Sequence, residues 1–308
     1  MSVETSAPIV QSTTPPGSAG RSEGWKSLLM WPSVVPLFLW MIVPLLLTVY
    51  FSFIRFNLLN PDISGFAGIE NYQFLWESES FIPAIINTIL LIGSVLVITV
   101  VLGVLLAVLY DREFFGKNIA TLFVIAPFFV MPTVSALIWK NMIMHPVYGL
   151  IALVLGKLGL RAVDWFGDYP LLSIIVIVSW EWLPFAFLIL YTSIKSLDSE
   201  QREASSIDGA GPMQQFFYIV LPHLRRAIGV VVMIETIFLL SIFAEIYTTT
   251  SGGPGTASTN LPFLVYLFGI QQSDVGLASA GGILAVILAN IVAIFMVRML
   301  AQSRKEAK

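Results

Sequence analysis

Residues 203–224 read EASSIDGAGPMQQFFYIVLPHL and lie within a connection of 34 residues, Ser193 to Arg226. This connection is far more polar and charged than the apolar stretches on either side of it. In an otherwise apolar chain, a segment of this kind belongs in water. It is therefore the part of the chain most suited to contact a soluble partner.

The same stretch predicts a short amphipathic helix over residues 199–207. Carboxylates at Glu200 and Glu203 near its start suit the helix dipole, and the glycines and proline of residues 209–212 end the helix and turn the chain. A helix this short is poorly stable alone, so it fits a groove on a partner and would pass the partner's movement to the flanking helices as a lever. The alternative is an ordinary solvated connection.

The chain as a whole has the composition of a membrane protein. Of 308 residues, 57% are hydrophobic and 11% charged, with a mean hydropathy of +0.86, whereas soluble domains carry about 25% charged residues. At about 20 residues per span, the chain holds about six spans and no separate soluble enzyme domain. We expect an all-α membrane protein with six transmembrane helices, at about residues 28–53, 82–110, 119–143, 171–192, 227–247 and 277–300.

The ends of the chain are polar. The first 24 residues include 14 Ser, Thr, Pro or Gly, which predicts a disordered tail over residues 1–27. A six-span transmembrane domain over residues 28–300 and a second tail over residues 301–308 are predicted to follow. The first apolar stretch is too long for a signal peptide and is predicted to be a retained span. If the N-terminus is inside, 12 of the 16 Lys and Arg residues face the cytoplasm, which predicts that both termini are cytoplasmic.

Prolines interrupt three of the predicted spans. They lie in the first span, in the third at Pro127 and Pro132, and in the fourth at Pro184. Each proline frees a backbone carbonyl and bends its helix. Such bends are either ordinary irregularities of membrane helices or the means of opening a central cavity.

Three carboxylates fall inside the predicted spans, where charged groups are costly and usually functional. Carboxylates and aromatic faces together suit a ligand rich in hydroxyl groups. The candidates for a translocation pathway are Trp180, Glu181, Trp182, Glu235, Phe238, Ser241 and Glu245. The alternative is that these residues bridge helices or lie near the ends of the spans.

The remaining chemistry is mostly excluded. There is no cysteine and no phosphate-binding G-x-x-x-x-G-K-[ST] loop, so we expect no disulfide and no resident ATP site. No catalytic residue, metal site or cofactor is predicted. The net charge of −3 and the pI near 5.4 give no support to a nucleic-acid partner.

The polar connection resembles the EAA signature of the membrane subunits of ATP-binding-cassette (ABC) importers. The signature has Glu, Ala and Ala, a Gly after three residues, and I-x-L-P after nine more; the one departure here is Ser205 in place of the second Ala. The residues that carry this resemblance, with two of their neighbours, are Glu203, Ala204, Ser205, Asp208, Gly209, Ala210, Ile219, Leu221 and Pro222. The resemblance implies that residues 193–226, called the coupling loop below, contact a separate ATPase.

Other segments extend the resemblance to the maltose-type carbohydrate importers. They are Ala67–Tyr72, Asn87–Thr88, Ile138–Trp139 with Pro146 and Tyr148–Gly149, Trp180–Phe185, and Thr250–Pro254 with Thr259. The resemblance implies a type I ABC importer permease in a bacterial inner membrane that works by alternating access. It also implies three protein partners: a sister permease in a heterodimer, a cytoplasmic ATPase dimer that binds the ATP, and an extracytoplasmic substrate-binding protein.

The substrate class follows from charge. No Lys or Arg is predicted near the middle of the membrane, and an anionic substrate would need such a partner unless the sister subunit supplied it. A neutral sugar or polyol is therefore favoured. The main alternative function is a secondary transporter in which Glu181 or Glu235 carries a coupling proton. An intramembrane hydrolase is disfavoured because His145 and His223 are predicted on opposite sides of the membrane.

Overall fold

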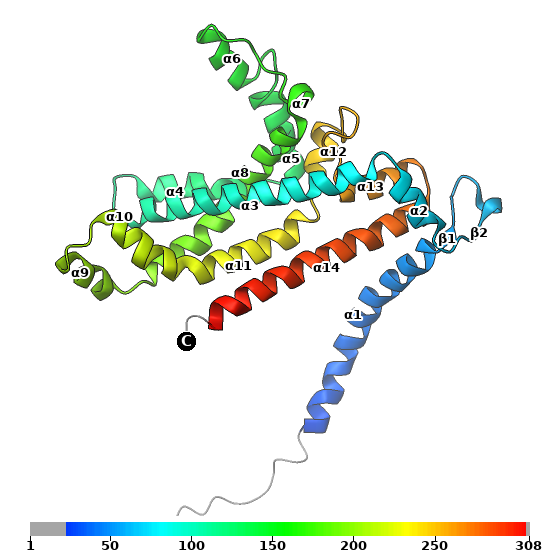
Figure 1. Cartoon of the computed structure of the whole chain (residues 1–308), viewed down its shortest axis with the longest axis horizontal. Coiled ribbons are helices and arrows are strands. Elements are labelled where there is room, and N and C mark those ends of the chain that lie inside the picture. Colours follow the sequence, from blue (N-terminus) through cyan, green and yellow to red (C-terminus); the bar gives the residue numbers. More distant parts are fainter. Residues whose placement is uncertain (1–22, 306–308) are drawn as a thin grey trace, which may run out of the picture. The chain divides into compact units, whose positions relative to one another are not determined.

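The computed structural model describes residues 23–305 and is almost entirely helical there (Figure 1). Five of its helices are long and apolar enough to cross a membrane, and a bent pair of helices makes a sixth span if it is counted as one. This confirms the prediction of an all-α membrane protein. The α-helices are α1 (Glu23–Ser52), α2 (Glu70–Glu77), α3 (Phe81–Asp111), α4 (Lys117–Ile125), α5 (Pro132–Ile138), α6 (Leu150–Lys157), α7 (Trp165–Asp168), α8 (Pro170–Lys195), α9 (Ser199–Ile207), α10 (Pro212–Gln215), α11 (Leu221–Leu239), α12 (Ala244–Thr249), α13 (Leu261–Tyr266) and α14 (Val275–Lys305).

Shorter elements complete the chain. A two-stranded antiparallel ribbon pairs β1 (Ile54–Arg55) with β2 (Gly65–Phe66), and two 3-10 turns, η1 (Pro61–Ile63) and η2 (Ala126–Phe129), are present. Three π-helical turns, η3 (Trp139–Ile143), η4 (Phe216–Val220) and η5 (Leu267–Gln271), each continue an α-helix.

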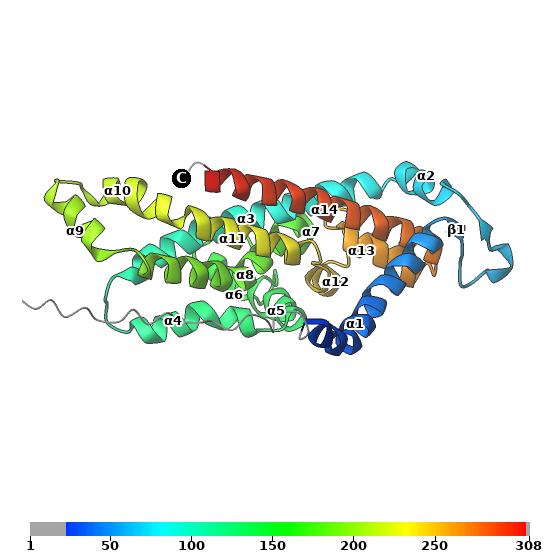
Figure 2. The ribbon, with the colours of Figure 1, turned by 90° about the horizontal axis from the view of Figure 1, so that it is seen from below.

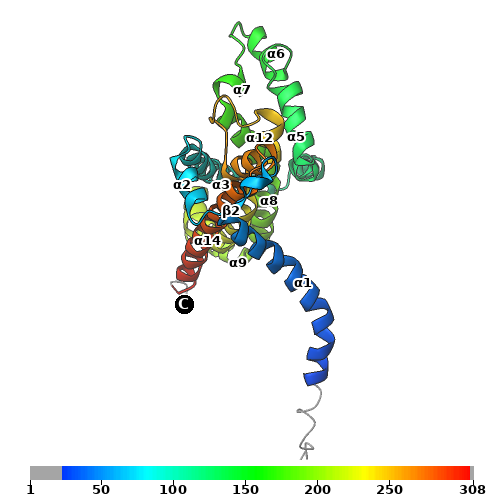
Figure 3. The same ribbon diagram turned by 90° about the vertical axis from the view of Figure 1, so that its right-hand side faces the viewer.

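The described chain divides into two units at residue 47. In the first unit, residues 23–47 belong to α1, whose side chains from Pro32 to Leu47 are nearly all exposed. In the second unit, α3, α8, α11 and α14 run alongside one another (Figures 1 and 2). At one end of these helices lie α9 and α10, and at the other lie α12 and α13, while α6 extends away from them (Figures 1 and 3).

The second unit is held together by tight packing between α3 and α8. A Cβ atom added at Gly103 of α3 would lie 3.1 Å from the Ala186 Cβ of α8, so the two helices approach closely. Two apolar clusters lie along this contact, one around Val95 and Val178 and the other around Ala107 and Phe187. The long helices therefore form a packed frame on which the shorter elements are mounted.

Two of the predicted spans differ from the structure. The third span is broken between Phe129 and Pro132, and its two halves are bent by 110°. The fifth span ends at Leu239, and residues 240–243 separate it from α12. Hydropathy missed both breaks because it averages composition over a window and does not register which backbone groups are bonded.

The predicted tails also differ from the helix ends. α1 already includes residues 23–27, and α14 continues to Lys305. The rest of the predicted tails, residues 1–22 and 306–308, lies outside the described residues. A further apolar helix, residues 261–271, was not predicted.

Candidate functional site

The coupling loop contains a well-defined helix at the predicted place. α9 covers residues 199–207, and the Asp198 side chain begins it by accepting a hydrogen bond from the Glu200 amide at 3.0 Å. Acidic caps satisfy free amides at a helix start and also suit the dipole. The interpretation of residues 199–207 as a helix is therefore confirmed.

The helix ends in a Schellman motif centred on Gly209. Gly209 has a φ of +84°, a conformation that L side chains rarely adopt. Its amide donates to the Ser206 carbonyl at 3.1 Å, and the Ala210 amide donates to the Ser205 carbonyl at 2.9 Å. The chain then reverses into α10, which begins at Pro212.

Side chains fasten α10 back onto α9. The Gln215 Nε2 donates to the Ser206 Oγ at 2.9 Å, and the Gly211 amide donates to the Gln214 Oε1 at 2.9 Å. The loop thus has a defined shape made by its own hydrogen bonds. It projects beyond the ends of the long helices (Figure 1).

Most of the predicted coupling residues face outward. Ile207, at the end of α9, is 86% exposed, although it is a large apolar side chain in a water-facing loop. The exposed members of the predicted set are Glu203, Ala204, Asp208, Gly209 and Pro222, and the half-buried members are Ser205, Ala210, Ile219 and Leu221. Exposed apolar side chains on a polar surface are typical of a binding surface.

The two ends of the loop are joined to each other. His223, in the first turn of α11, donates from Nε2 to the Ser193 carbonyl near the end of α8 at 2.9 Å. The Ser196 Oγ lies 3.2 Å from the same nitrogen. His223 therefore joins α11 to α8.

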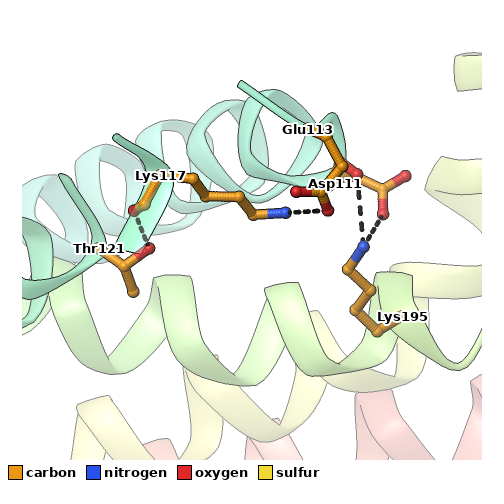
Figure 4. Close-up of polar contacts among 5 residues, drawn as sticks. All are labelled: Asp111, Glu113, Lys117, Thr121 and Lys195. Carbon is orange, nitrogen blue, oxygen red and sulfur yellow. Dashed lines mark hydrogen bonds and ion pairs between the residues drawn. The ribbon is translucent and has the colours of Figure 1, made fainter. Parts of the chain in front are cut away.

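An ion pair joins the end of α8 to the end of α3 (Figure 4). Lys195 Nζ lies 3.1 Å from the Asp111 Oδ1 and also donates to the Asp111 backbone carbonyl at 3.3 Å. A cation on the last carbonyls of a helix interacts favourably with its dipole. The base of the coupling loop is therefore fastened to α3 as well as to α11.

A second pair lies beside the first (Figure 4). Lys117 Nζ donates to the Glu113 carboxylate at 2.8 Å, and this hydrogen bond holds the pKa of Glu113 below its usual range. Both lysines approach the Tyr191 ring, whose centroid lies 5.8 Å from Lys117 Nζ and 5.6 Å from Lys195 Nζ. These contacts connect the start of the bent third span to the same base.

A cavity of about 280 Å³ lies where the third and fifth spans are broken. Its lining residues are Pro127, Phe128, Val130, Pro132, Glu181, Trp182, Phe238, Ser241, Ile242, Phe243, Ala244 and Glu245. The volume is close to the lower end of the usual range for ligand pockets, about 300 Å³. Two carboxylates and several aromatic rings thus line the same cavity.

Five of the seven predicted pathway residues line this cavity: Glu181, Trp182, Phe238, Ser241 and Glu245. Glu181 is buried, and its Oε1 makes no hydrogen bond with any described residue. The Trp182 ring packs on Phe238 at 5.2 Å and on Phe128 at 6.1 Å. A hydroxyl donor in the cavity would satisfy the Glu181 oxygen that the protein leaves without a partner.

The other two predicted pathway residues lie elsewhere. The Trp180 ring contacts Trp139 at 5.8 Å. Glu235 is fully buried and accepts a hydrogen bond from the Thr99 Oγ1 of α3 at 2.7 Å. Glu235 therefore bridges two helices, which was the alternative interpretation for these acids.

Four lining residues come from the broken third span and were not predicted as pathway residues: Pro127, Phe128, Val130 and Pro132. The signal that could have found them was the pair of prolines, which was noted as a bend. Which side chains that bend turns inward depends on the 110° angle, and the angle is not readable from proline spacing.

Comparison with known proteins identifies the family. Residues 99–306 match the family described as binding-protein-dependent transport system inner membrane component. The chain is 31% identical over 259 residues to a probable ABC transporter permease protein, y4oQ, of Sinorhizobium fredii, covering 82% of this chain and 84% of that protein. It is 28% identical to the trehalose/maltose transport system permease protein MalF of Thermococcus litoralis, covering 85% and 88% of the two chains.

The fold agrees with this assignment. A solved bacterial ABC transporter involved in the import of the acidic polysaccharide alginate superposes with a TM-score of 0.77 at 24% identity, covering 92% of this chain and 96% of that chain. The relatives are permease subunits, so the prediction of a non-enzymatic membrane transport subunit is confirmed. The chain belongs to the binding-protein-dependent transport system inner membrane components, the multi-pass permease subunits of ABC importers.

Proposed function

We propose that this permease moves a neutral sugar or polyol across the inner membrane by alternating access, driven by a separate ATPase that binds the coupling loop. The observation that carries the proposal is α9, a capped and exposed helix whose base is joined to α3, α8 and α11. Force applied to α9 would reach the helices that lead to the cavity.

The partners follow from what the chain lacks. No phosphate-binding loop is present in the sequence, so the ATP is bound by a partner, which we propose is a cytoplasmic ATPase dimer. If the ATPase is cytoplasmic, the coupling loop that binds it lies in the cytoplasm as well. The distribution of Lys and Arg supports the same side for both termini. A sister permease and an extracytoplasmic substrate-binding protein complete the proposed importer.

The cavity supports a neutral substrate. None of the described residues that line it is Lys, Arg or His, while Glu181 and Glu245 present carboxyl groups. An anionic substrate would find no cationic partner among these lining residues. Trp182 and Phe238 offer aromatic faces to the C–H surfaces of a sugar ring. Relatives named for trehalose and maltose transport support the sugar class.

Uptake into vesicles tests both the substrate class and the energy source. The complete complex, isolated from its native membranes, is reconstituted with its binding protein and offered radiolabelled maltose, trehalose, sorbitol or glycerol 3-phosphate. We expect uptake of a neutral compound that needs ATP inside the vesicle and persists when the proton gradient is collapsed. Uptake that needs only the proton gradient would instead support a secondary transporter. Uptake of glycerol 3-phosphate alone would contradict the neutral class.

A further inference from the structure

The break in the fifth span leaves backbone groups without helical partners. If α11 continued through residues 240–243, the Ile242 carbonyl would accept a hydrogen bond from the amide four residues later. Phe243 instead has φ −143° and ψ −48°, and α12 begins anew at Ala244. A buried carbonyl within a membrane must find another donor, because an unsatisfied group there is costly.

Asn260 supplies that donor. Its Nδ2 donates to the Ile242 carbonyl at 2.6 Å, while its Oδ1 accepts from the Phe263 amide at 3.0 Å and so caps α13. Asn260 is 1% exposed and Ile242 is 7% exposed. One amide side chain therefore joins the break in the fifth span to the start of α13.

The segment before Asn260 is itself fixed to α3. Asn87 Nδ2 donates to the carbonyls of Thr256 and Thr259, each at 2.9 Å. Thr88 Oγ1 accepts from the Leu261 amide at 3.0 Å. This explains why the sequence carries Asn87–Thr88 and the Thr250–Thr259 segment together, although they are about 170 residues apart.

The far end of α12 is held separately. Lys140 Nζ, from the second half of the broken third span, donates to the Thr248 carbonyl at 3.1 Å. α12 is thus fixed at its beginning through Asn260 and near its end through Lys140. Between these two points lies Glu245, one of the two cavity carboxylates.

We propose that Asn260, anchored through the Thr256–Leu261 segment to Asn87 and Thr88, is a positioning residue for the cavity. It fixes the non-helical residues 240–243. It thereby determines the positions of Ser241, Ile242 and Phe243 in the cavity wall, and the position of Glu245. That this cavity is the transport pathway rests on the proposed function. The link between Asn260 and the cavity wall can be tested without a known substrate.

Cysteine labelling measures the wall directly, because the chain has no cysteine. Ser241→Cys, an exposed position that lines the cavity, is made in the full chain and treated in native membranes with a charged methanethiosulfonate reagent. The labelling rate at position 241 is then compared with the rate in a chain that also carries Asn260→Ser. The serine side chain retains a helix-capping oxygen but is too short to reach Ile242. We expect the rate to change by about fivefold or more, because loss of a buried hydrogen bond shifts conformer populations by about that factor.

A matched control is available at Asn57. Asn57 likewise accepts from a nearby amide, that of Leu59, and donates to a distant carbonyl, that of Gln272. It is half-buried, its hydrogen bonds are exposed, and it does not line the cavity. Asn57→Ser should leave the labelling rate unchanged, whereas Asn87→Leu, a second change within the network, should alter it as Asn260→Ser does.

The inference would be overturned if Asn260→Ser and Asn87→Leu both left the labelling rate at position 241 equal to that of Ser241→Cys alone. Absence of labelling in all of these variants would count as equal rates. Loss of the protein from the membrane in both network variants would also overturn the inference, because the network would then support the fold rather than the cavity wall. Failure of the proposed function would appear in a different experiment, as uptake that needs only the proton gradient or as uptake of glycerol 3-phosphate alone.

Discussion

The buried carboxylates of this permease have different surroundings, although they look alike in sequence. Glu181 and Glu235 each have an Oε1 without a hydrogen-bond partner among the described residues. Glu181 lines the cavity, whereas Glu235 accepts a hydrogen bond from Thr99 through its other oxygen and does not line the cavity. Substrate contact is therefore expected of Glu181 and not of Glu235.

At Glu181, replacement by Ala removes a candidate acceptor for a substrate hydroxyl. A buried polar group that loses its hydrogen-bond partner costs about 1–3 kcal/mol, so this change should raise the apparent KM for uptake by about tenfold. Glu235→Gln is the control, and it should leave KM unchanged because it does not line the cavity. Uptake kinetics in vesicles measure both variants. An unchanged KM for Glu181→Ala across several sugars would remove Glu181 from the pathway.

At Lys195, the expected effect is smaller. The side chains of Lys195 and Asp111 are 44% and 17% exposed, and ion pairs of such groups contribute little to stability. Lys195→Ala should leave membrane abundance unchanged but raise the ATP hydrolysed per sugar transported by about two- to fivefold. The exchange Asp111→Lys with Lys195→Asp should restore coupling in part. Normal coupling in Lys195→Ala would show that packing between α3 and α8 is sufficient.

At the scale of elements, the sequence was most informative where local rules decide the structure. Residues 199–207 could be predicted as a helix because its cap, its charges and its terminal glycine lie within a few residues of one another. The breaks at residues 130–131 and 240–243 could not be placed. At the second break, the Ile242 carbonyl is bonded by the side chain of Asn260, 18 residues further along the chain, and hydropathy contains no information about such a bond.

The turn that ends α9 gives a prediction of its own. Gly209 has a positive φ, so Gly209→Ala should cost about 1–2 kcal/mol of local stability and reduce transport. Gly209→Pro should abolish transport while the protein still inserts, because proline cannot adopt this φ and lacks the amide that bonds Ser206. Gly116, with a φ of +80° and open space around it, is the matched control. Gly116→Ala should carry a similar strain without loss of coupling.

Normal transport by Gly209→Pro at parental abundance would contradict the lever role of α9. Equal loss of transport in Gly116→Ala would mean that any strained turn on this side has the same effect, and the special role of Gly209 would be lost. Immunoblots of membranes and uptake assays give both quantities.

At the scale of the whole molecule, the fold class and the family could be predicted, whereas the shape of the site could not. Apolar length and an ordered set of short motifs were enough to indicate a six-span permease, and the family match and a solved structure confirm it. The cavity depended on two helix breaks that only tertiary hydrogen bonds and the bend at Pro127 and Pro132 define. Five of the seven predicted pathway residues nevertheless line it, because intramembrane acids and aromatics are a strong local signal.

The transport mechanism proposed above requires that α9 and the turn at Gly209 bind an ATPase. The most direct measurement is affinity purification of the tagged chain from its native membranes in mild detergent, followed by mass spectrometry of what remains bound. We expect recovery of a phosphate-loop ATPase and a second six-span chain, with the ATPase lost when Glu203→Arg and Gly209→Pro are combined. Recovery of the chain alone, active in proton-driven uptake after reconstitution, would contradict that mechanism.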